Sequence, residues 1–260
     1  MSPTIVFNKH VNYSCAMNTL DESKEIFHTV KFEYLKKHLE EGCMYFSKLE
    51  DFRTRKKDPL ESFCDYVSLA IPGFSKPVDA PQYAQDSYIS SWRLEYNDEY
   101  MWNNFSIDGT SIQISTTVGK LKKIMENFVL TQYKNLKRNE VWQCSDIVSL
   151  EPIDYYLDDY LHQVKNQLKQ EKEIGRDTLT AMLNNIFKLR KLFSNEKELR
   201  AYIHSEHDYS FLLVPVDFMN FIDSISFDPK ATDSFKEEAA TFLTSYGFCK
   251  KIIKTAETEN

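Results

Sequence analysis

Several segments of the chain repeat apolar residues at intervals of three and four, the spacing of an amphipathic helix. The clearest is residues 31–42, which ends at Gly42, a residue typical of the position just after a helix. A capping-box pattern, Ser234 followed by Glu237, marks the start of the last of these segments. Besides residues 31–42, helices are therefore expected at residues 118–138, 155–172, 177–192 and 232–247.

Other segments alternate polar and apolar residues or form short apolar runs, as strands do. In residues 110–116, Ile112 and Ile114 alternate with polar residues, which predicts a half-buried strand. Residues 209–216 are apolar enough for a central strand. Further strands are expected at residues 43–49, 86–92 and 221–229.

The strand candidates lie before residue 117 and after residue 193, with helices between them. This order is typical of an α+β fold. We predict a single α+β domain over residues 1–260, with a mainly helical insertion at about 118–192. The strands on both sides of the insertion are expected to pair into a shared sheet.

The stretch FSNEKELRAYI, residues 193–203, concentrates charge in what looks like one short strand. In a strand, Glu196, Glu198 and Arg200 share one face because successive side chains point to opposite sides. Two carboxylates and a guanidinium are costly on a face that is covered. Two interpretations are open: either these three charged side chains line a cleft, or they form weak ion pairs on an exposed edge strand or a solvated turn.

Composition narrows the class of protein. The chain has 260 residues, a net charge of −7 and 6 scattered glycines, which excludes a P-loop and a Rossmann fingerprint. The acidic balance argues against non-specific nucleic-acid binding. The 5 cysteines include no C-x-x-C pair, so neither a disulfide framework nor a zinc site is expected. No secretory signal or run of about 18 apolar residues is found, and we expect a cytoplasmic protein with no membrane partner.

Two further clusters have a weaker chemical interpretation. His204 and His207 flank an acidic residue, but no third ligand has a matching spacing, so we expect no metal. The basic run at residues 53–57 is interpreted as an exposed, mobile loop, with contact to the phosphates of a nucleotide or nucleic acid as the alternative.

Short motifs follow one another in a fixed order between residues 26 and 248. They are His28-Thr29, Gly42-Cys43-Met44-Tyr45-Phe46-Ser47, Asp58-Pro59-Leu60-Glu61, Ser90-Ser91, Trp102, Gly109 and Glu196-x-Glu198-x-Arg200. In this order they resemble a bacterial family known only as domain of unknown function 2971. The layout is in turn similar to the ADP-ribosyltransferase superfamily, which implies a split β-sheet core carrying a helical insertion.

The resemblance also implies a site for nicotinamide adenine dinucleotide (NAD) as substrate. In the superfamily a His or Arg on the first strand, a Tyr or Ser on a middle strand and a Glu on a late strand surround this dinucleotide. By order, His28 takes the first role, Ser90 or Ser91 the second and Glu198 the third. The chain departs from the pattern in two ways, because no Tyr follows His28 and the middle motif begins with Ile89 instead of Phe.

The chemistry of the implied reaction gives each remaining residue a role. Cleavage of the nicotinamide–ribose bond passes through a cationic sugar, which a carboxylate such as Glu198 stabilises mainly in the transition state. Glu196 would position the acceptor, whose class (protein, nucleic acid or small molecule) stays open. Arg200 would keep the carboxylates ionised or bind the pyrophosphate. Thr29 and Trp92 are the other predicted dinucleotide contacts, with a plain core role as the alternative for Trp92.

A different class of function remains open beside this one. The alternative to this leading interpretation is a non-enzymatic module that recognises a nucleotide or a partner, for example in phage defence or regulation. The feature that discriminates the two is whether His28, Ser90 or Ser91, and Glu198 converge around one cleft.

Overall fold

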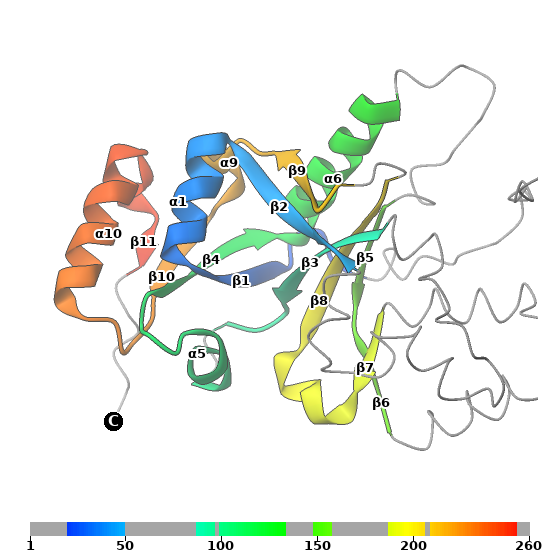
Figure 1. The fold of residues 1–260 in the computed structure, drawn as a ribbon, viewed down its shortest axis with the longest axis horizontal. Helices are drawn as coiled ribbons and strands as arrows, with labels where there is room; N and C mark the ends of the chain where they lie inside the picture. The colour runs from blue at the N-terminus through cyan, green and yellow to red at the C-terminus, as the bar shows by residue number, and fades with distance from the viewer. Residues whose placement is uncertain are drawn as a thin grey trace, which may run out of the picture.

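A computed structural model gives the structure of the chain. It describes residues 20–49, 87–96, 99–133, 148–157, 187–205 and 209–253, and the structural statements below concern these ranges. Within them the protein is a mixture of helices and strands arranged around one large sheet (Figure 1).

The elements follow in three groups along the chain. The first group contains β1 (Glu25–Lys31), α1 (Phe32–Glu41), β2 (Cys43–Lys48), β3 (Ser87–Arg93), α5 (Glu99–Phe105) and β4 (Ser111–Thr117). The second contains α6 (Val118–Tyr133), β5 (Val148–Pro152), β6 (Asp154–Tyr156), β7 (Lys188–Arg190) and the 3-10 helix η4 (Lys191–Glu196). The third contains β8 (Glu198–His204), β9 (Phe211–Pro215), α9 (Phe218–Phe221), β10 (Ser224–Phe227), α10 (Asp233–Ser245), η5 (Phe248–Lys250) and β11 (Ile252–Ile253).

Strands from both ends of the chain form one sheet. Its 9 strands run in the order β11-β10-β4-β1-β3-β2-β9, with β8 paired to β3 and β5 paired to β8. The prediction that the early and late strands share a sheet is therefore confirmed. A separate two-stranded sheet joins β6 and β7 in parallel.

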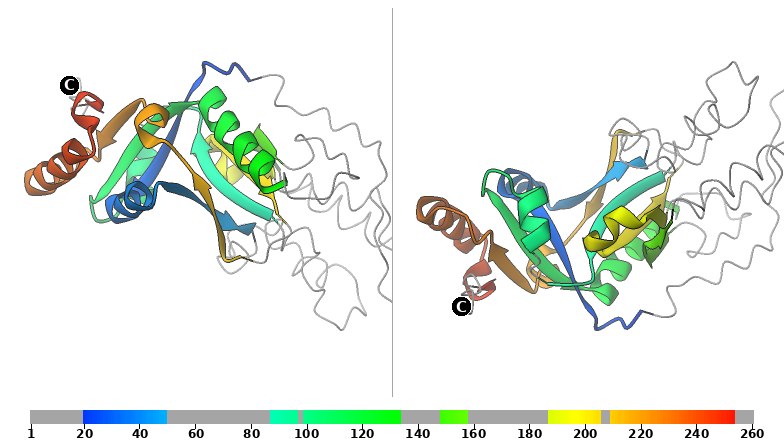
Figure 2. Two further views of the ribbon diagram at one scale, coloured as in Figure 1. Left: turned by 90° about the horizontal axis from the view of Figure 1, so that it is seen from above. Right: turned by 90° about the horizontal axis from the view of Figure 1, so that it is seen from below.

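The large sheet forks at β3. One edge of β3 pairs with β8 over its whole length, from Ser87 opposite His204 to Arg93 opposite Glu198. The other edge pairs with β2 near its beginning, where Ile89 lies opposite Ser47, and with β1 only at Arg93. β1 and β2 consequently diverge on this side of β3, as the two views of Figure 2 show. Neither of them pairs in register with the stretch of β3 between these contacts.

The two faces of the sheet differ in character. One face carries the apolar rows of β1, β4, β3 and β8 and joins α6 in a single core. Helix α6, which contacts β4, β5 and β9, contributes the buried stripe Val118, Leu121, Met125 and Val129. The other face is polar where β3 meets β8, because alternation places Ser91, Arg93, Glu198 and Arg200 there. The site described below lies on this polar face.

Most of the predicted elements match. The helix at residues 31–42 is α1, and Gly42 has the expected left-handed backbone, with φ 63°. The strands at residues 43–49, 86–92, 110–116 and 221–229 correspond to β2, β3, β4 and β10. The last helix is α10, but its N-cap is Thr232, whose hydroxyl accepts from the N–H of Phe235, and not the predicted Ser234.

Two strands lie in different environments from those predicted. Residues 111–116 of β4 are buried on both faces, including the polar Ser111, Gln113 and Ser115, and β1 and β10 pair with its two edges. β9 ends the path of the sheet instead of lying at its centre, and its residues alternate between exposed and buried. Hydrophobic content alone does not separate an edge strand from a central one.

The segment at 118–192 is the least well predicted. It begins with α6 as expected, but β5 joins the large sheet and β6 and β7 pair with each other. Tyr155, predicted in a helix, lies in β6, where its hydroxyl accepts from the backbone N–H of Glu198 at 2.8 Å. A tertiary contact of this kind overrides local helix propensity. The end of the second predicted helix is wrong as well, because residues 188–190 form β7 and residues 191 and 192 begin η4. Residues 158–172 and 177–186, like the basic run at 53–57, lie outside the described ranges, so those parts of the predictions stand untested.

Across the described ranges, no helix is both long enough and apolar enough to cross a membrane.

Candidate functional site

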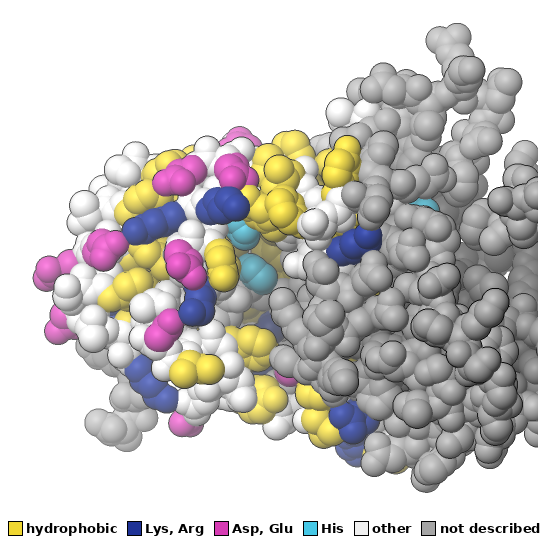
Figure 3. All heavy atoms as spheres, viewed as in Figure 1, with side chains coloured by type: hydrophobic (Ala, Val, Ile, Leu, Met, Phe, Trp, Pro, Cys, Tyr) yellow, Lys and Arg dark blue, Asp and Glu magenta, His cyan; other side chains and the backbone are white. Residues whose placement is uncertain are grey.

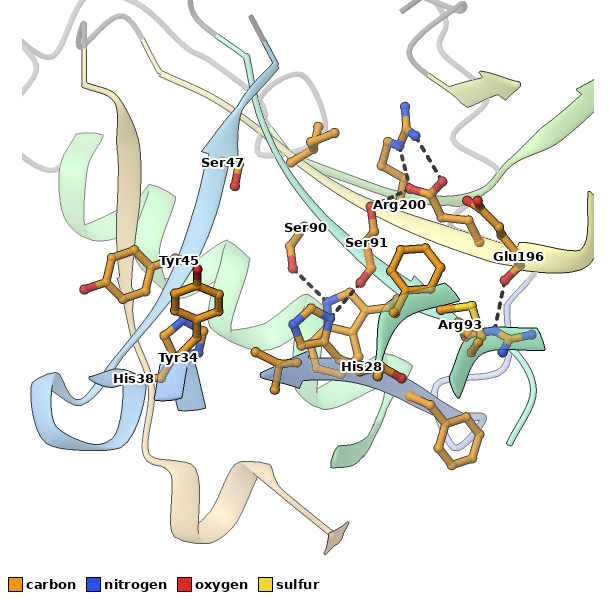
Figure 4. Close-up of a pocket in the computed structure, with 18 of the residues that line it drawn as sticks. His28, Tyr34, His38, Tyr45, Ser47, Ser90, Ser91, Arg93, Glu196 and Arg200 are labelled. Carbon is orange, nitrogen blue, oxygen red and sulfur yellow. Dashed lines mark hydrogen bonds and ion pairs between the residues drawn. The ribbon is translucent and has the colours of Figure 1, made fainter. Parts of the chain in front are cut away.

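A pocket of about 480 Å³ lies on the polar face where the sheet forks. Side chains from β1, α1, β2, β3, α5, β7, η4 and β8 line it, so segments distant in sequence meet there (Figure 4). In the space-filling view, histidine side chains are visible in a hollow bordered by hydrophobic side chains and a cationic one (Figure 3). The volume falls within the range of ligand-binding pockets, about 300–1,000 Å³.

Every residue that the sequence analysis assigned to the site lines this one pocket. They are His28, Thr29, Ser90, Ser91, Trp92, Glu196, Glu198 and Arg200. The structure thus brings the predicted set together; the role of each residue stays a prediction.

Glu198 is the most constrained of these side chains. Its Oε1 accepts from the Ser91 hydroxyl at 2.6 Å and from Nε of Arg200 at 2.8 Å, while Oε2 accepts from Nη2 of Arg200 at 3.0 Å. The carboxylate side chain is only 6% exposed and that of Arg200 is 2% exposed. Two roles were predicted for Arg200, and in the structure its guanidinium contacts the Glu198 carboxylate. Fork-like pairing of this kind holds a carboxylate in one orientation.

His28 is tied to the same serine by a different atom. Its Nδ1 donates to the backbone carbonyl of Ser91 at 2.8 Å, because a carbonyl oxygen only accepts. Burial lowers the pKa of His28, and the hydrogen bond to Ser91 opposes this in part. The ring is therefore neutral near pH 7, with Nε2 as an acceptor. Its centroid lies 5.1 Å from that of Trp92.

Ser91 consequently connects three strands at the fork. Ser91 is an exposed residue of β3. Its backbone carbonyl accepts a hydrogen bond from His28 of β1, and its hydroxyl donates one to Glu198 of β8. Ser90, the alternative left open by the sequence, has its hydroxyl occupied by Nε1 of Trp92 at 3.2 Å. Of the two serines, Ser91 is the one that joins the histidine and the carboxylate.

Glu196 lines the pocket, but not in the way the sequence predicted. It is the last residue of η4 and does not belong to β8, so the expected row of three charges on one strand is wrong. Lys197 interrupts the row, because its backbone is left-handed, with φ 43°. Only Glu198 and Arg200 share a strand face.

Thr29 and Trp92 have partners that explain their positions. The hydroxyl of Thr29 accepts from Nε2 of the buried Gln113 at 3.4 Å. Trp92 is 1% exposed and belongs to the hydrophobic core, where its ring also packs against Phe221. This placement favours the core role that the sequence analysis left open for Trp92.

The sequence analysis missed an aromatic group at the α1–β2 side of the pocket. In Figure 4, Tyr34, His38 and Tyr45 lie on one side of His28, and Glu196 and Arg200 lie on the other. The rings of His38 and Tyr45 stack with centroids 4.8 Å apart. Burial, followed by the electrostatic effects of His28 and Lys37, lowers the pKa of His38 to about 4. The spacing of Tyr34 and His38, four residues apart in a helix facing β2, was the signal available.

Arg93 is a second residue that the sequence analysis missed. It is 3% exposed, lines the pocket, and donates from Nε to the carbonyl of Glu196 at 3.0 Å and from Nη2 to that of Asn195 at 3.1 Å. Its position two residues after Ser91 places both on one strand face, which is the pattern that could have identified it.

No group of His, Cys, Asp and Glu side chains within the described ranges is arranged to hold a metal ion.

Fold and site together define a mixed helix-and-sheet protein whose pocket joins a histidine, a serine and a buried glutamate. No protein-family model matches the chain. Comparison with curated proteins gives no match either.

Among the solved structures similar to this chain are three complexes of the DarT of Thermus sp. 2.9. Its complex with ADP-ribosylated ssDNA is 9% identical, with a TM-score of 0.39 over 92% of this chain and 96% of that one. Its complex with carba-NAD+ is 8% identical, with a TM-score of 0.37 over 91% and 97%. Its complex with NAD+ is 8% identical, with a TM-score of 0.36 over 87% and 91%.

Proposed function

We propose that the protein is an ADP-ribosyltransferase-like enzyme that binds NAD in this pocket and cleaves its nicotinamide–ribose bond. One observation carries the proposal: His28, Ser91 and Glu198, chosen from three separate segments of the sequence, converge through Ser91 in a single pocket. This is the arrangement that the sequence analysis named as the test between an enzyme and a non-enzymatic binding module.

The fork at β3 supports the same proposal for the fold. An ADP-ribosyltransferase-like core is a split sheet, and here β1 and β2 diverge from β3 beside Ser91. The pocket lies at the divergence, where backbone groups and side chains of both branches can reach one ligand. The proposal also includes three expectations from the sequence. The chain would belong to the family known as domain of unknown function 2971, would form a single domain over residues 1–260, and would be cytoplasmic.

In the proposed reaction the C1′–N bond of the nicotinamide riboside breaks, and nicotinamide leaves with the electron pair. The sugar becomes cationic, and Glu198, held in a fixed orientation by Ser91 and Arg200, is the carboxylate assigned to that charge. A fixed negative charge at that point stabilises the transition state more than the ground state. An acceptor oxygen then bonds to C1′ and gives its proton to Glu196.

The aromatic side of the pocket fits the rest of a dinucleotide. Tyr34 is 54% exposed, so its ring offers a free face for a base. Tyr45 is held between His38 and Phe211, with centroids 4.8 and 5.0 Å away. Base–aromatic stacking contributes about 1–3 kcal/mol per base. Thr29 would be a polar contact between the two sides.

A second function has its own supporting observation. Glu198 is 5% exposed and both of its oxygens are already bonded to Arg200 or Ser91. A carboxylate neutralised by a buried guanidinium stabilises a cationic sugar less than a free one does. The same pocket would then serve a non-enzymatic module that binds a nucleotide, in regulation or phage defence.

Incubation with NAD labelled in both halves separates the two functions. The enzyme releases nicotinamide and leaves labelled ADP-ribose in solution or on an acceptor, for which single-stranded DNA, RNA and protein are each offered. Glu198→Gln should lower nicotinamide release by about 10²- to 10³-fold, the usual effect of one preorganised electrostatic contact. A protein that binds NAD at equilibrium but releases no nicotinamide would instead be the binding module.

A matched control is available on the neighbouring strand. Glu151 lies on β5 opposite Arg200 and accepts from the Ser149 hydroxyl, outside the pocket lining. Glu151→Gln removes the same charge from the same sheet and should leave nicotinamide release unchanged. The rate of nicotinamide release by each variant is divided by the fraction of that variant that is folded, so that a loss of stability is not counted as a loss of catalysis.

A further inference from the structure

The corner between η4 and β8 carries Glu196 to the wall of the pocket. It turns at Lys197, whose φ of 43° makes it the one non-glycine residue with a positive φ in the described ranges. L-amino acids adopt this conformation rarely, and it persists where the surroundings hold it in place. The direction of the Glu196 side chain therefore depends on what fixes this corner.

The end of β3 supplies that support. Arg93 donates from Nη2 to the carbonyl of Asn195 at 3.1 Å and from Nε to that of Glu196 at 3.0 Å. The next residue, Leu94, donates its N–H to the carbonyl of Lys197 at 3.2 Å. Three successive carbonyls at the end of a 3-10 helix, which the helix itself leaves without donors, are thus held by Arg93, the last residue of β3, and by Leu94, which follows it.

The guanidinium suits this task better than other side chains. Its donors lie in one rigid plane, so two neighbouring carbonyl oxygens can be held at a fixed separation and angle. A lysine ammonium, a compact charge on a flexible stem, does not impose such a geometry. Burying a cation is costly, and Arg93 is only 3% exposed, so its retention here points to a geometric role.

We propose that Arg93 is a positioning residue that directs the Glu196 carboxylate toward the acceptor of the transferred ADP-ribose. The inference rests on the proposed function, because it assigns Glu196 to the proton of the acceptor oxygen. That oxygen bonds to C1′ as the C1′–N bond breaks, nicotinamide takes the electron pair, and Glu196 takes the proton. Arg93 acts only through the backbone of Glu196, so its effect should vanish when the Glu196 carboxylate is absent.

The test uses methanol as a simple acceptor in competition with water. Parent, Arg93→Lys, Glu196→Gln and the double variant are incubated with NAD, and methyl ADP-ribose is measured per nicotinamide released. Each single variant should lower this ratio by about tenfold, because a small displacement of a catalytic group is enough for such a loss. The double variant should lower it by the same tenfold and not by about a hundredfold, since the two residues act as one unit.

A second measurement needs no substrate. Amide exchange of Leu94, Lys197 and Glu198, whose N–H groups are bonded within or onto the corner, should quicken by about tenfold in Arg93→Lys. The amides that join β1 to β4 serve as an internal control and should not change. Arg93→Met removes the donors altogether and should show the same pattern more strongly where it folds.

The outcomes separate this inference from the proposed function. Unchanged exchange at the corner, or multiplicative losses in the double variant, overturns the positioning role. A raised KM for NAD with an unchanged methanol ratio also overturns it, because Arg93 then contacts the dinucleotide directly. A parent that releases no nicotinamide refutes the proposed reaction, and with it the assignment of Glu196; the exchange measurement then decides only whether Arg93 holds the corner.

Discussion

Breaking the ion pair between Glu198 and Arg200 should destabilise the protein strongly. The two side chains are 6% and 2% exposed and meet through both carboxylate oxygens. Removing one partner of such a buried pair costs about 3–5 kcal/mol, because the remaining charge stays in a medium that solvates it poorly. In Glu198→Gln the amide oxygen can still accept from Ser91, so we expect the low end, about 3 kcal/mol.

The complementary variant should behave alike. Arg200→Met leaves the carboxylate with the Ser91 hydroxyl and should also cost about 3 kcal/mol. When both charges are removed, in Glu198→Gln with Arg200→Met, no uncompensated ion remains, and the loss should fall to about 1–2 kcal/mol. The two single variants together then lose about 4 kcal/mol more free energy of unfolding than the double variant does. Independent sites deviate from additivity by only about 0.5 kcal/mol, so this difference would show that the two residues are coupled.

Urea unfolding of the four proteins measures this coupling. A typical domain has only about 5–15 kcal/mol of stability, so the single variants are best measured at low temperature, where the folded state is populated. Single losses that add to the double loss within about 0.5 kcal/mol would show that the pair is screened by solvent, and the buried geometry argued here would be wrong.

Three further predictions concern positions away from this pair. Burial lowers the pKa of His38 from 6.5 to about 4, so stability should fall as pH drops through that window, where the unfolded chain binds the extra proton. Because the ring is partly exposed, we expect the free energy of unfolding to be about 1 kcal/mol lower at pH 4.5 than at pH 7, as measured by urea unfolding. This contribution should be absent from His38→Gln. Lys197→Gly should match the parent within about 0.5 kcal/mol, whereas Lys197→Val should lose about 2 kcal/mol, because a branched side chain rarely tolerates positive φ. Thr232→Ala should cost about 1 kcal/mol in thermal unfolding and Thr232→Ser nearly nothing, as expected for an N-cap.

The elements that the sequence predicted well are those whose pattern is local. Helix α1 has its apolar stripe and its terminal glycine within a single stretch, and β3 and β4 are short runs bounded by turn residues. The pairing of β3 with both β1 and β2 is different in kind. It depends on contacts between residues far apart in the chain, and no periodicity within one strand encodes which neighbours it takes.

The candidate site was predictable to the extent that its residues recur as motifs. The order of the motifs selected His28, the serine pair and Glu198, and the structure places them together. The same reasoning failed for Glu196, because alternation assumes a continuous strand and Lys197 breaks it with a conformation that its residue type does not announce. Arg93 was missed because its partners are backbone carbonyls, which every residue possesses, so that only its spacing from Ser91 on the strand could have indicated it.

The break at Lys197 explains how one short segment carries two carboxylates with different properties. On β8, alternation sends Leu199, Ala201 and Ile203 into the core and fixes Glu198 and Arg200 on the opposite face, where the pair neutralises itself. Had the strand continued through residue 196, the Glu196 carboxylate would have lain two residues from that of Glu198 on the same face, where like charges disfavour ionisation of both. The 3-10 turn instead places Glu196 outside the strand, on the pocket wall. Under the proposed function, the rigidly held Glu198 would orient the sugar and the more accessible Glu196 would take the proton of the acceptor.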